Sequence, residues 1–296
     1  MTETGPDLAF ARRLADAADA IALRHFRAAG TAWHTKGDGS PVSIADEEIE
    51  HTLRAAIRQE HPGDSVLGEE FGALGRGRRR WIIDAIDGTA SFLAGEPEWS
   101  TLIALEVAGT VVLGLVTAPA LRRRWWAARG AGAWSQATEP AGVPAQRVTI
   151  TGAGRLEEAA VGIWPPPPRL SAANLAIAAR LAAAARRTRP EETDWTDATG
   201  SCGPIPKPST GSGTCHGALL VATGQLDAFL LLGVGPWDIA ALVPIIEEAG
   251  GSYTELADAP SSEARSSDAP SSGTASALFT NADLRQEIIG VTKHEL

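Results

Sequence analysis

Two aspartates that follow an apolar run are the residues of this chain best placed to do chemistry. The run 81–83 (WII) leads directly into Asp84 and Asp87, three positions apart. Two ionised carboxylates at the rim of a core repel each other, so either one stays protonated or a divalent cation neutralises both. Mg²⁺ suits such a pair best because it takes hard oxygen ligands and is commonly shared between carboxylates and phosphates.

A turn that favours an anion follows these aspartates. If a helix begins just after Gly88, the first backbone N–H groups, those of Thr89, Ala90 and Ser91, point outward without helical partners. The helix dipole also favours negative charge there. We therefore predict that Gly88, Thr89 and Ala90 bind phosphate.

Other acids also stand at the ends of predicted elements, and each has a simpler reading. Asp46 closes an S-x-x-D capping box that begins at Ser43, and it is either only a capping partner or a residue that supports the site. Asp238 follows Pro-Trp and, taken alone, reads as a helix N-cap or first-turn acid. Glu70, next to Glu69, is either a base near the metal or a surface acid.

Hydrophobic periodicity predicts mixed α and β elements to position these acids. Helices are expected at 7–29, 43–59, 171–187, 215–223 and 238–249, and strands at 65–67, 81–83, 102–107, 111–117, 124–128, 228–232 and 252–256. The strands between 65 and 128 are expected to form one antiparallel meander. Residues 34–41 and 199–213 are rich in glycine, proline and turn formers and are expected to lack regular structure, the first as an exposed, mobile loop.

The domain organisation follows from the same pattern. An N-terminal half, 1–150, carries most of the acids, and a C-terminal half, 151–296, carries Asp238 and the wall of a substrate pocket. The four prolines at 165–168 are the best linker candidate. The segment 257–276, almost wholly Ala, Ser, Asp, Pro and Glu, is expected to be a disordered insertion without function.

Composition excludes several classes of protein. Of the 296 residues, 44% are hydrophobic, enough for a full core, and the net charge of −10 argues against nucleic acid or an anionic membrane surface as partner. No apolar run is long enough to span a membrane and no signal peptide is visible, so we predict a cytoplasmic protein. Only Cys202 and Cys215 occur, without CxxC spacing, which argues against a disulfide framework or a structural zinc site and for a metal held by oxygen.

Four short acidic segments stand in an order and at a spacing that one enzyme family shares. They are 41–46 (PVSIAD), 68–70 (GEE), 84–89 (DAIDGT) and 237–241 (WDIAA). Together they resemble the inositol monophosphatase family of magnesium-dependent, lithium-sensitive phosphatases. The first 150 residues are most similar to actinobacterial histidinol-phosphate phosphatases, through segments 62–72 (PGDSVLGEEFG) and 118–126 (APALRRRWW).

The resemblance implies a fold, a cofactor and roles for individual residues. The fold is an α/β (α+β) layered αβαβα sandwich of the inositol monophosphatase/fructose-1,6-bisphosphatase type, usually a homodimer. In the family's mechanism a metal-bound water, oriented by a threonine and nearby carboxylates, attacks phosphorus in line. Two or three Mg²⁺ ions would be bound by Glu69, Asp84, the carbonyl of Ile86, Asp87 and Asp238. Thr89, Asp46 and Glu70 would be the catalytic group, and Lys36 would lie on a loop that closes over the site.

The chain departs from the family where the leaving group binds. Ala85 replaces a usual proline, and Ala90-Ser91 replaces a polar residue followed by asparagine. The family has an acid that hydrogen-bonds a substrate hydroxyl or amine. Counting back from Asp238 without a gap, the position of that acid is occupied by Leu231 in this chain. The loss of that acceptor would cost a polyol about 1 to 3 kcal/mol, so myo-inositol phosphate is disfavoured. With Leu231, the expected pocket wall comprises Thr214 and His216.

We therefore predict a Mg²⁺-dependent phosphomonoesterase that acts on a small phosphorylated metabolite, with a histidinol-phosphate-like substrate first. The alternatives are a nucleotide or sugar/inositol phosphatase of the same superfamily, or a member that binds a phosphorylated ligand without turnover. A Cys215-His216 nucleophile pair is disfavoured because neighbours on a helix point about 100° apart. A packed cysteine and a pocket-wall histidine are expected instead.

Overall fold

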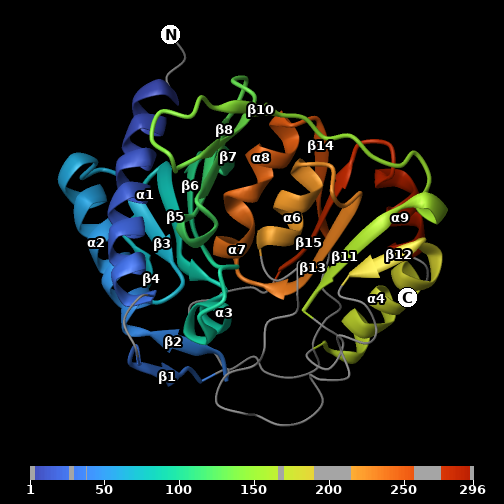
Figure 1. The fold of residues 1–296 in the computed structure, drawn as a ribbon, viewed down its shortest axis with the longest axis horizontal. Coiled ribbons are helices and arrows are strands. Elements are labelled where there is room, and N and C mark those ends of the chain that lie inside the picture. The colour runs from blue at the N-terminus through green and yellow to red at the C-terminus, as the bar shows by residue number, and fades with distance from the viewer. Residues whose placement is uncertain are drawn as a thin grey trace.

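The computed structural model describes residues 4–26, 30–37, 39–165, 170–189, 215–256 and 275–293. Within these ranges two large sheets alternate with three layers of helices, and a third sheet has only two short strands (Figure 1). Helices α1 (Thr4–Phe26) and α2 (Ile44–Glu60) cover the outer face of the larger sheet. Between the sheets lie α6 (Cys215–Ala222), α7 (Pro236–Ala240) and α8 (Leu242–Glu248). The far face of the smaller sheet is covered by α4 (Ala172–Ala184) and α9 (Arg285–Lys293). The expected αβαβα sandwich is confirmed.

The larger sheet has eight strands and lies within the predicted N-terminal half. In sheet order they are β10 (Gln146–Val148), β9 (Ala133–Ala137), β8 (Arg123–Ala128), β7 (Thr110–Ala118), β6 (Ser100–Val107), β5 (Arg79–Asp87), β3 (Ser65–Gly68) and β4 (Gly72–Leu74). Strands β5 to β8 pair antiparallel, as predicted. The prediction of a single meander is wrong for β3, which pairs parallel to β5, because the chain turns back through β4 before β5 enters on the other side of β3.

The smaller sheet has five strands and lies within the C-terminal half. Its order is β12 (Arg187–Arg189), β11 (Ala160–Trp164), β13 (Ala228–Val234), β15 (Ala275–Asn281) and β14 (Gly251–Leu256). Residues 275 and 276 belong to β15, so the expected disordered insertion is wrong at that end; 257–274 lie outside the described residues. The linker prolines 166–168 and the irregular segment 199–213 also lie outside them.

The helices pack their apolar residues on the sheets. They are α1 (Thr4–Phe26), α2 (Ile44–Glu60), α3 (Thr89–Ala94), α4 (Ala172–Ala184), α6 (Cys215–Ala222), α7 (Pro236–Ala240), α8 (Leu242–Glu248) and α9 (Arg285–Lys293), with 3₁₀ turns η1 (Pro119–Leu121) and η2 (Leu156–Glu158). Three apolar clusters result, one on each side of the larger sheet and one beyond the smaller sheet. None of the helices in the described ranges has the length and apolar character needed to cross a membrane.

Three further expectations need correction. The single helix expected at 238–249 is two helices, which meet at Ala241, because Pro244 has no N–H to donate to the carbonyl of residue 240. The helix expected at 171–187 ends at Ala184, and its last expected residue begins β12. The segment 34–41 is not wholly irregular, since β1 (Trp33–Thr35) and β2 (Pro41–Ser43) pair antiparallel across it.

Candidate active site

Two aspartates of β5 and a third from a distant part of the sequence converge at the end of that strand. The β5 ladder shifts register between Asp84 and Asp87, and α7 brings Asp238 to the same place. One carboxylate oxygen from each of the three lies within 4.8 Å of the others. Asp238 also accepts a 2.7 Å hydrogen bond from the N–H of Gly235, so it is a first-turn acid of α7 as well as a member of this cluster.

The cluster has the properties of a cation site. Asp84 is 1% exposed, and among the described residues its Oδ1 has no hydrogen-bond partner. Burial, and then the charges of Glu69, Asp87 and Asp238, raise the pKa of Asp84 well above its usual range. An unpartnered buried oxygen among like charges is costly unless a cation neutralises it, and an all-oxygen donor set suits Mg²⁺. These residues therefore fit the metal that the family resemblance implies.

The turn after β5 holds the threonine hydroxyl. Gly88 has a φ of 87°, and a Cβ there would lie 3.0 Å from the carbonyl oxygen of Glu98, so only glycine fits without strain. Thr89 then begins α3, and its hydroxyl lies 3.1 Å from both Asp46 Oδ1 and the carbonyl oxygen of Ile86. Ala90 occupies the next position of α3. Phosphate binding by this turn stays a prediction.

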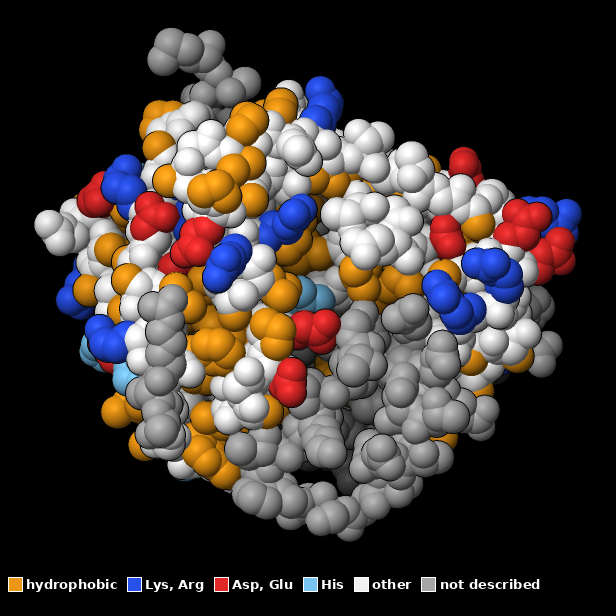
Figure 2. Space-filling view, viewed as in Figure 1, with side chains coloured by type: hydrophobic (Ala, Val, Ile, Leu, Met, Phe, Trp, Pro, Cys, Tyr) orange, Lys and Arg blue, Asp and Glu red, His pale blue; other side chains and the backbone are white. Residues whose placement is uncertain are grey.

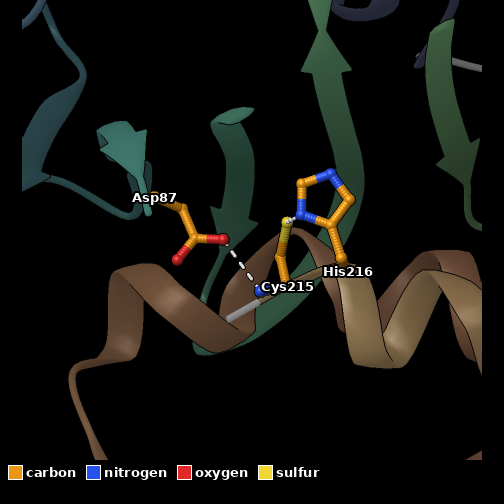
Figure 3. Close-up of side chains that lie close together, drawn as sticks. All are labelled: Asp87, Cys215 and His216. Atoms are coloured by element: carbon orange, nitrogen blue, oxygen red, sulfur yellow. Dashed lines mark hydrogen bonds between the residues drawn. The ribbon is translucent and has the colours of Figure 1, made fainter. Parts of the chain in front are cut away.

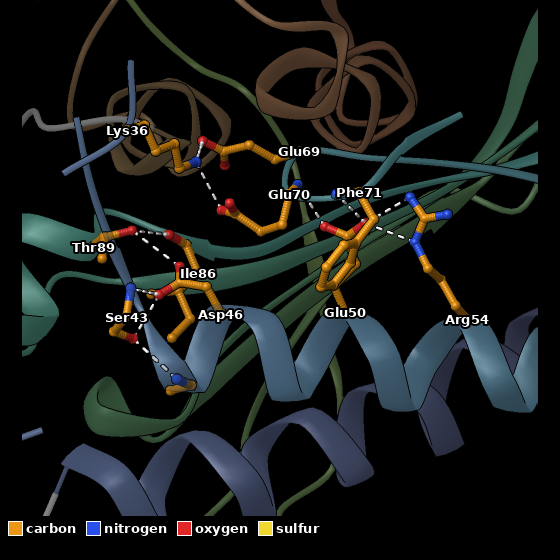
Figure 4. Close-up of polar contacts among 11 residues, drawn as sticks. Lys36, Ser43, Asp46, Glu50, Arg54, Glu69, Glu70, Phe71, Ile86 and Thr89 are labelled. Atoms are coloured by element: carbon orange, nitrogen blue, oxygen red, sulfur yellow. Dashed lines mark hydrogen bonds and ion pairs between the residues drawn. The ribbon is translucent and has the colours of Figure 1, made fainter. Parts of the chain in front are cut away.

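Asp46 holds this hydroxyl while it also caps α2 (Figure 4). Its Oδ2 accepts hydrogen bonds from the backbone N–H of Ser43 at 2.8 Å and from the Ser43 hydroxyl at 2.6 Å. Burial raises the pKa of Asp46 to about 6, although the Ser43 and Thr89 bonds oppose that shift. The two readings of Asp46 are thus compatible, because one oxygen serves the capping box and the other serves Thr89.

Lys36 joins the two glutamates of the next segment. Its ammonium group lies 2.6 Å from Glu69 Oε1 and 2.8 Å from Glu70 Oε1. The side chain of Glu70 is only 8% exposed, so it is not a solvated surface acid. Burial and then the charge of Glu69 raise the pKa of Glu70 to about 7. Burial by itself would lower the pKa of Lys36, but the carboxylates of Glu69 and Glu70 outweigh it and raise that pKa.

Glu50 and Arg54 were missed in the sequence analysis, yet from helix α2 they support the segment that carries Glu69 and Glu70. Glu50 is 0% exposed and accepts hydrogen bonds from the N–H of Glu70 at 2.8 Å, the N–H of Phe71 at 3.2 Å and Arg54 Nε at 2.7 Å (Figure 4). A signal existed, because Glu50 falls four positions after Asp46 and three before Leu53, on the buried face of α2. A Glu–Arg pair at i,i+4 on that face indicates a buried polar contact.

The remaining predicted residues lie along the C-terminal half. His216 is 7% exposed, and burial lowers its pKa to about 4. Leu231 is 1% exposed and packs in the apolar cluster between the sheets, while Thr214 lies outside the described residues. Figure 2 shows a hollow near the centre of one face, with acidic side chains at its edge and a histidine inside it. Whether Leu231 and His216 contact a substrate stays a prediction.

Comparisons with known proteins point to one family. The family model described as "Inositol monophosphatase family" matches residues 5–287. A histidinol-phosphatase of Streptomyces coelicolor is 37% identical over 96% of this chain and 96% of its own length. One of Mycobacterium tuberculosis is 37% identical over 84% and 87%. A solved inositol monophosphatase of Zymomonas mobilis superposes with a TM-score of 0.75 at 25% identity and covers 99% of this chain and 100% of its own.

Proposed function

The chain belongs to the inositol monophosphatase family, as a phosphoric monoester hydrolase, and from this premise we propose that it cleaves histidinol phosphate or a closely related amino-alcohol phosphate with Mg²⁺ as cofactor. The observation that carries the reaction class is the convergence of Asp84, Asp87 and Asp238 around an unpartnered carboxylate oxygen. The substrate rests on the two histidinol-phosphatases that are 37% identical to this chain.

The metal would be held by the three clustered aspartates and by two neighbouring groups. Asp84, Asp87 and Asp238 would bind it, joined by the carbonyl of Ile86 and by Glu69, which lies close enough to raise the pKa of Asp84. Two or three ions are proposed. Bound Mg²⁺ would neutralise charge on the phosphoryl group and make water more acidic.

The chain's own residues would orient and deprotonate the attacking water. The hydrogen of the Thr89 hydroxyl is directed at Asp46 and the Ile86 carbonyl, so the lone pairs of its oxygen are left to accept from a water. Glu70 has a pKa of about 7, which suits a group that takes a proton near neutral pH. Lys36 holds the Glu70 carboxylate in position.

Leu231 favours a substrate whose leaving alcohol is not a polyol. Its side chain packs among apolar residues and offers no acceptor to a hydroxyl group. The likeness to a solved inositol monophosphatase keeps an inositol or sugar phosphate as the second candidate. A homodimer is also part of this proposal, and sedimentation of the purified chain tests it.

The test is phosphate release from histidinol phosphate, myo-inositol phosphate, a hexose phosphate and a nucleoside monophosphate, with Mg²⁺ or with EDTA. We expect kcat/KM for histidinol phosphate to exceed the others by at least about tenfold, and all rates to need Mg²⁺. The variant Asp87→Asn should be inactive on every ester. A preference for inositol phosphate would select the second candidate, and hydrolysis in EDTA would contradict the metal site.

A further inference from the structure

Cys215 and His216 lie against the metal-binding face, and the proposed reaction uses neither side chain. They begin α6, and the backbone N–H of Cys215 donates a 2.8 Å hydrogen bond to Asp87 Oδ2. Figure 3 shows the Cys215 thiol between the Asp87 carboxylate and the His216 ring. Residues 128 positions apart are thus joined at a point that sequence spacing could not reveal.

The three side chains form a compact donor set of mixed chemistry. Cys215 Sγ lies 3.9 Å from His216 Nδ1, and one ligand atom from each of Asp87, Cys215 and His216 lies within 4.8 Å of the others. All three residues are buried, at 4%, 1% and 7% exposure. Sulfur, imidazole nitrogen and carboxylate oxygen together suit Zn²⁺, whereas Mg²⁺ takes oxygen alone.

The histidine is also oriented for such a role. Its Nε2 lies 3.4 Å from the hydroxyl of Ser100, on the side of the ring opposite to the thiol. A proton on Nε2 that is shared with Ser100 leaves the lone pair of Nδ1 directed at the sulfur. Metal-binding histidines usually have their second nitrogen fixed in this way.

We propose that Asp87, Cys215 and His216 form a second cation site that takes Zn²⁺ or a similarly thiophilic divalent cation. Three protein donors leave a fourth tetrahedral position for water. Binding would form a zinc–sulfur bond and release the thiol proton to solvent, with no change of oxidation state. The sequence-based expectation of oxygen ligands would then hold for Mg²⁺ only.

Because Asp87 belongs to both donor sets, the two cations would compete. A Zn²⁺ ion at this site would withdraw Asp87 from the Mg²⁺ cluster, so Zn²⁺ would inhibit hydrolysis. This consequence rests on the proposed function, whereas the binding site itself does not.

Cobalt provides a readout that is independent of activity. The full-length chain, freed of metal with a chelator, is titrated with Co²⁺, and the near-ultraviolet thiolate-to-cobalt charge-transfer band is recorded before and after Zn²⁺ is added. We expect a band that Zn²⁺ abolishes, and we expect Cys215→Ser and Cys215→Ala to lack it. Cys202→Ser is the matched control and should keep the band, because Cys202 is the only other cysteine. No band in the wild-type chain, or a band that depends on Cys202, would overturn the proposal.

A second measurement separates this proposal from the proposed function. The Zn²⁺ concentration that halves the rate at fixed Mg²⁺ is measured for wild type and Cys215→Ser, each relative to its own uninhibited rate. We expect the value to rise at least about tenfold in the variant. Equal sensitivity in both would reject Cys215 as a ligand. A chain that hydrolyses no phosphoester but shows the cobalt band would contradict the proposed function and leave the site standing.

Discussion

The buried carboxylate of Glu50 accepts a 2.8 Å hydrogen bond from the peptide N–H of Glu70, and this bond ties helix α2 to the segment that carries both site glutamates. The approach is close enough to need a glycine, since a Cβ on Gly68 would lie 2.0 Å from Glu50 Oε1. Arg54 neutralises Glu50 from the same helix. The positions of Glu69 and Glu70 therefore depend on a residue that is not among the proposed metal ligands.

Glu50→Gln should weaken the hydrogen bonds that hold this segment, while a side chain of nearly the same size still fills the site. An amide has one acceptor oxygen where the carboxylate has two, so at least one of the N–H groups now bonded to Glu50 loses its partner. We expect a loss of about 1 to 3 kcal/mol in the free energy of unfolding and a rise of about tenfold in the Mg²⁺ concentration for half-maximal rate. Urea unfolding and a Mg²⁺ titration of phosphate release measure the two effects.

A glutamate at the end of the same helix serves as the control. Glu60 pairs with Arg13 at the surface, where both side chains are about half exposed, and Glu60→Gln should change neither quantity beyond about 0.5 kcal/mol or twofold. If Glu50→Gln lowers stability but leaves the Mg²⁺ requirement unchanged, Glu50 supports the fold and does not position the site.

Removal of the Thr89 hydroxyl should affect rate far more than stability. Thr89→Val keeps the β-branched shape but gives up both 3.1 Å contacts, to Asp46 and to the Ile86 carbonyl. We expect kcat to fall by about 10²- to 10⁴-fold with little change in KM, whereas Thr89→Ser should retain most of the rate. Steady-state kinetics of both variants decide this, and a valine variant within a few fold of wild type would remove Thr89 from the mechanism.

The single tyrosine offers a test of pH-dependent stability at a residue outside the carboxylate cluster. Burial, and then the charges of Glu255 and Glu247, raise the pKa of Tyr253 to about 12, while an unfolded tyrosine titrates near 10. A raised folded pKa means that the stability contribution is complete below about pH 10 and is lost as the pH rises toward 12. Tyr253→Phe keeps the tilted ring contact with Phe279 and should remove this loss.

Urea unfolding at pH 8 and pH 11 should therefore show a relative gain for Tyr253→Phe, on the order of 1 kcal/mol after solvent screening at this partly buried site. Because the chain has one tyrosine, the phenolate absorbance of the native protein reports its pKa directly. A midpoint near 10 in that titration would refute the shift.

Local pattern predicted the elements that bury apolar stripes, and longer-range contacts account for what it missed. Helix α2, its capping box and strands β5 to β8 were predicted because alternation and i,i+4 spacing act within a few residues. The parallel pairing of β3 with β5 was not, since it depends on which side of β3 the chain enters after β4. The break between α7 and α8 was visible in the sequence as Pro244, but the prediction gave it no weight.

The same division applies to the site. Asp84, Asp87 and Asp238 were selected from their places at element ends and from the family resemblance, and the structure brings them together. The supporting contacts are a different matter, because Glu50 to Glu70 and Asp87 to Cys215 join residues 20 and 128 positions apart. No local pattern encodes such contacts, since each arises only when a helix packs against the larger sheet.

Asp84 should cost the metal-free protein stability that the metal restores. Its Oδ1 is buried without a partner among the described residues, and the charges of Glu69, Asp87 and Asp238 are close. Asp84→Asn removes a buried ionisable group that faces these three charges, so in EDTA the variant should be more stable than wild type by about 1 to 2 kcal/mol. Mg²⁺ should raise the Tm of wild type and leave that of the variant almost unchanged, because the variant lacks a ligand. Phosphate release should fall by more than about 100-fold.

Thermal unfolding of both proteins with EDTA and with Mg²⁺ measures whether Asp84 lowers stability in the absence of the metal. If Asp84→Asn is less stable than wild type in EDTA, or gains as much from Mg²⁺, then Asp84 is a structural acid and the metal lies elsewhere.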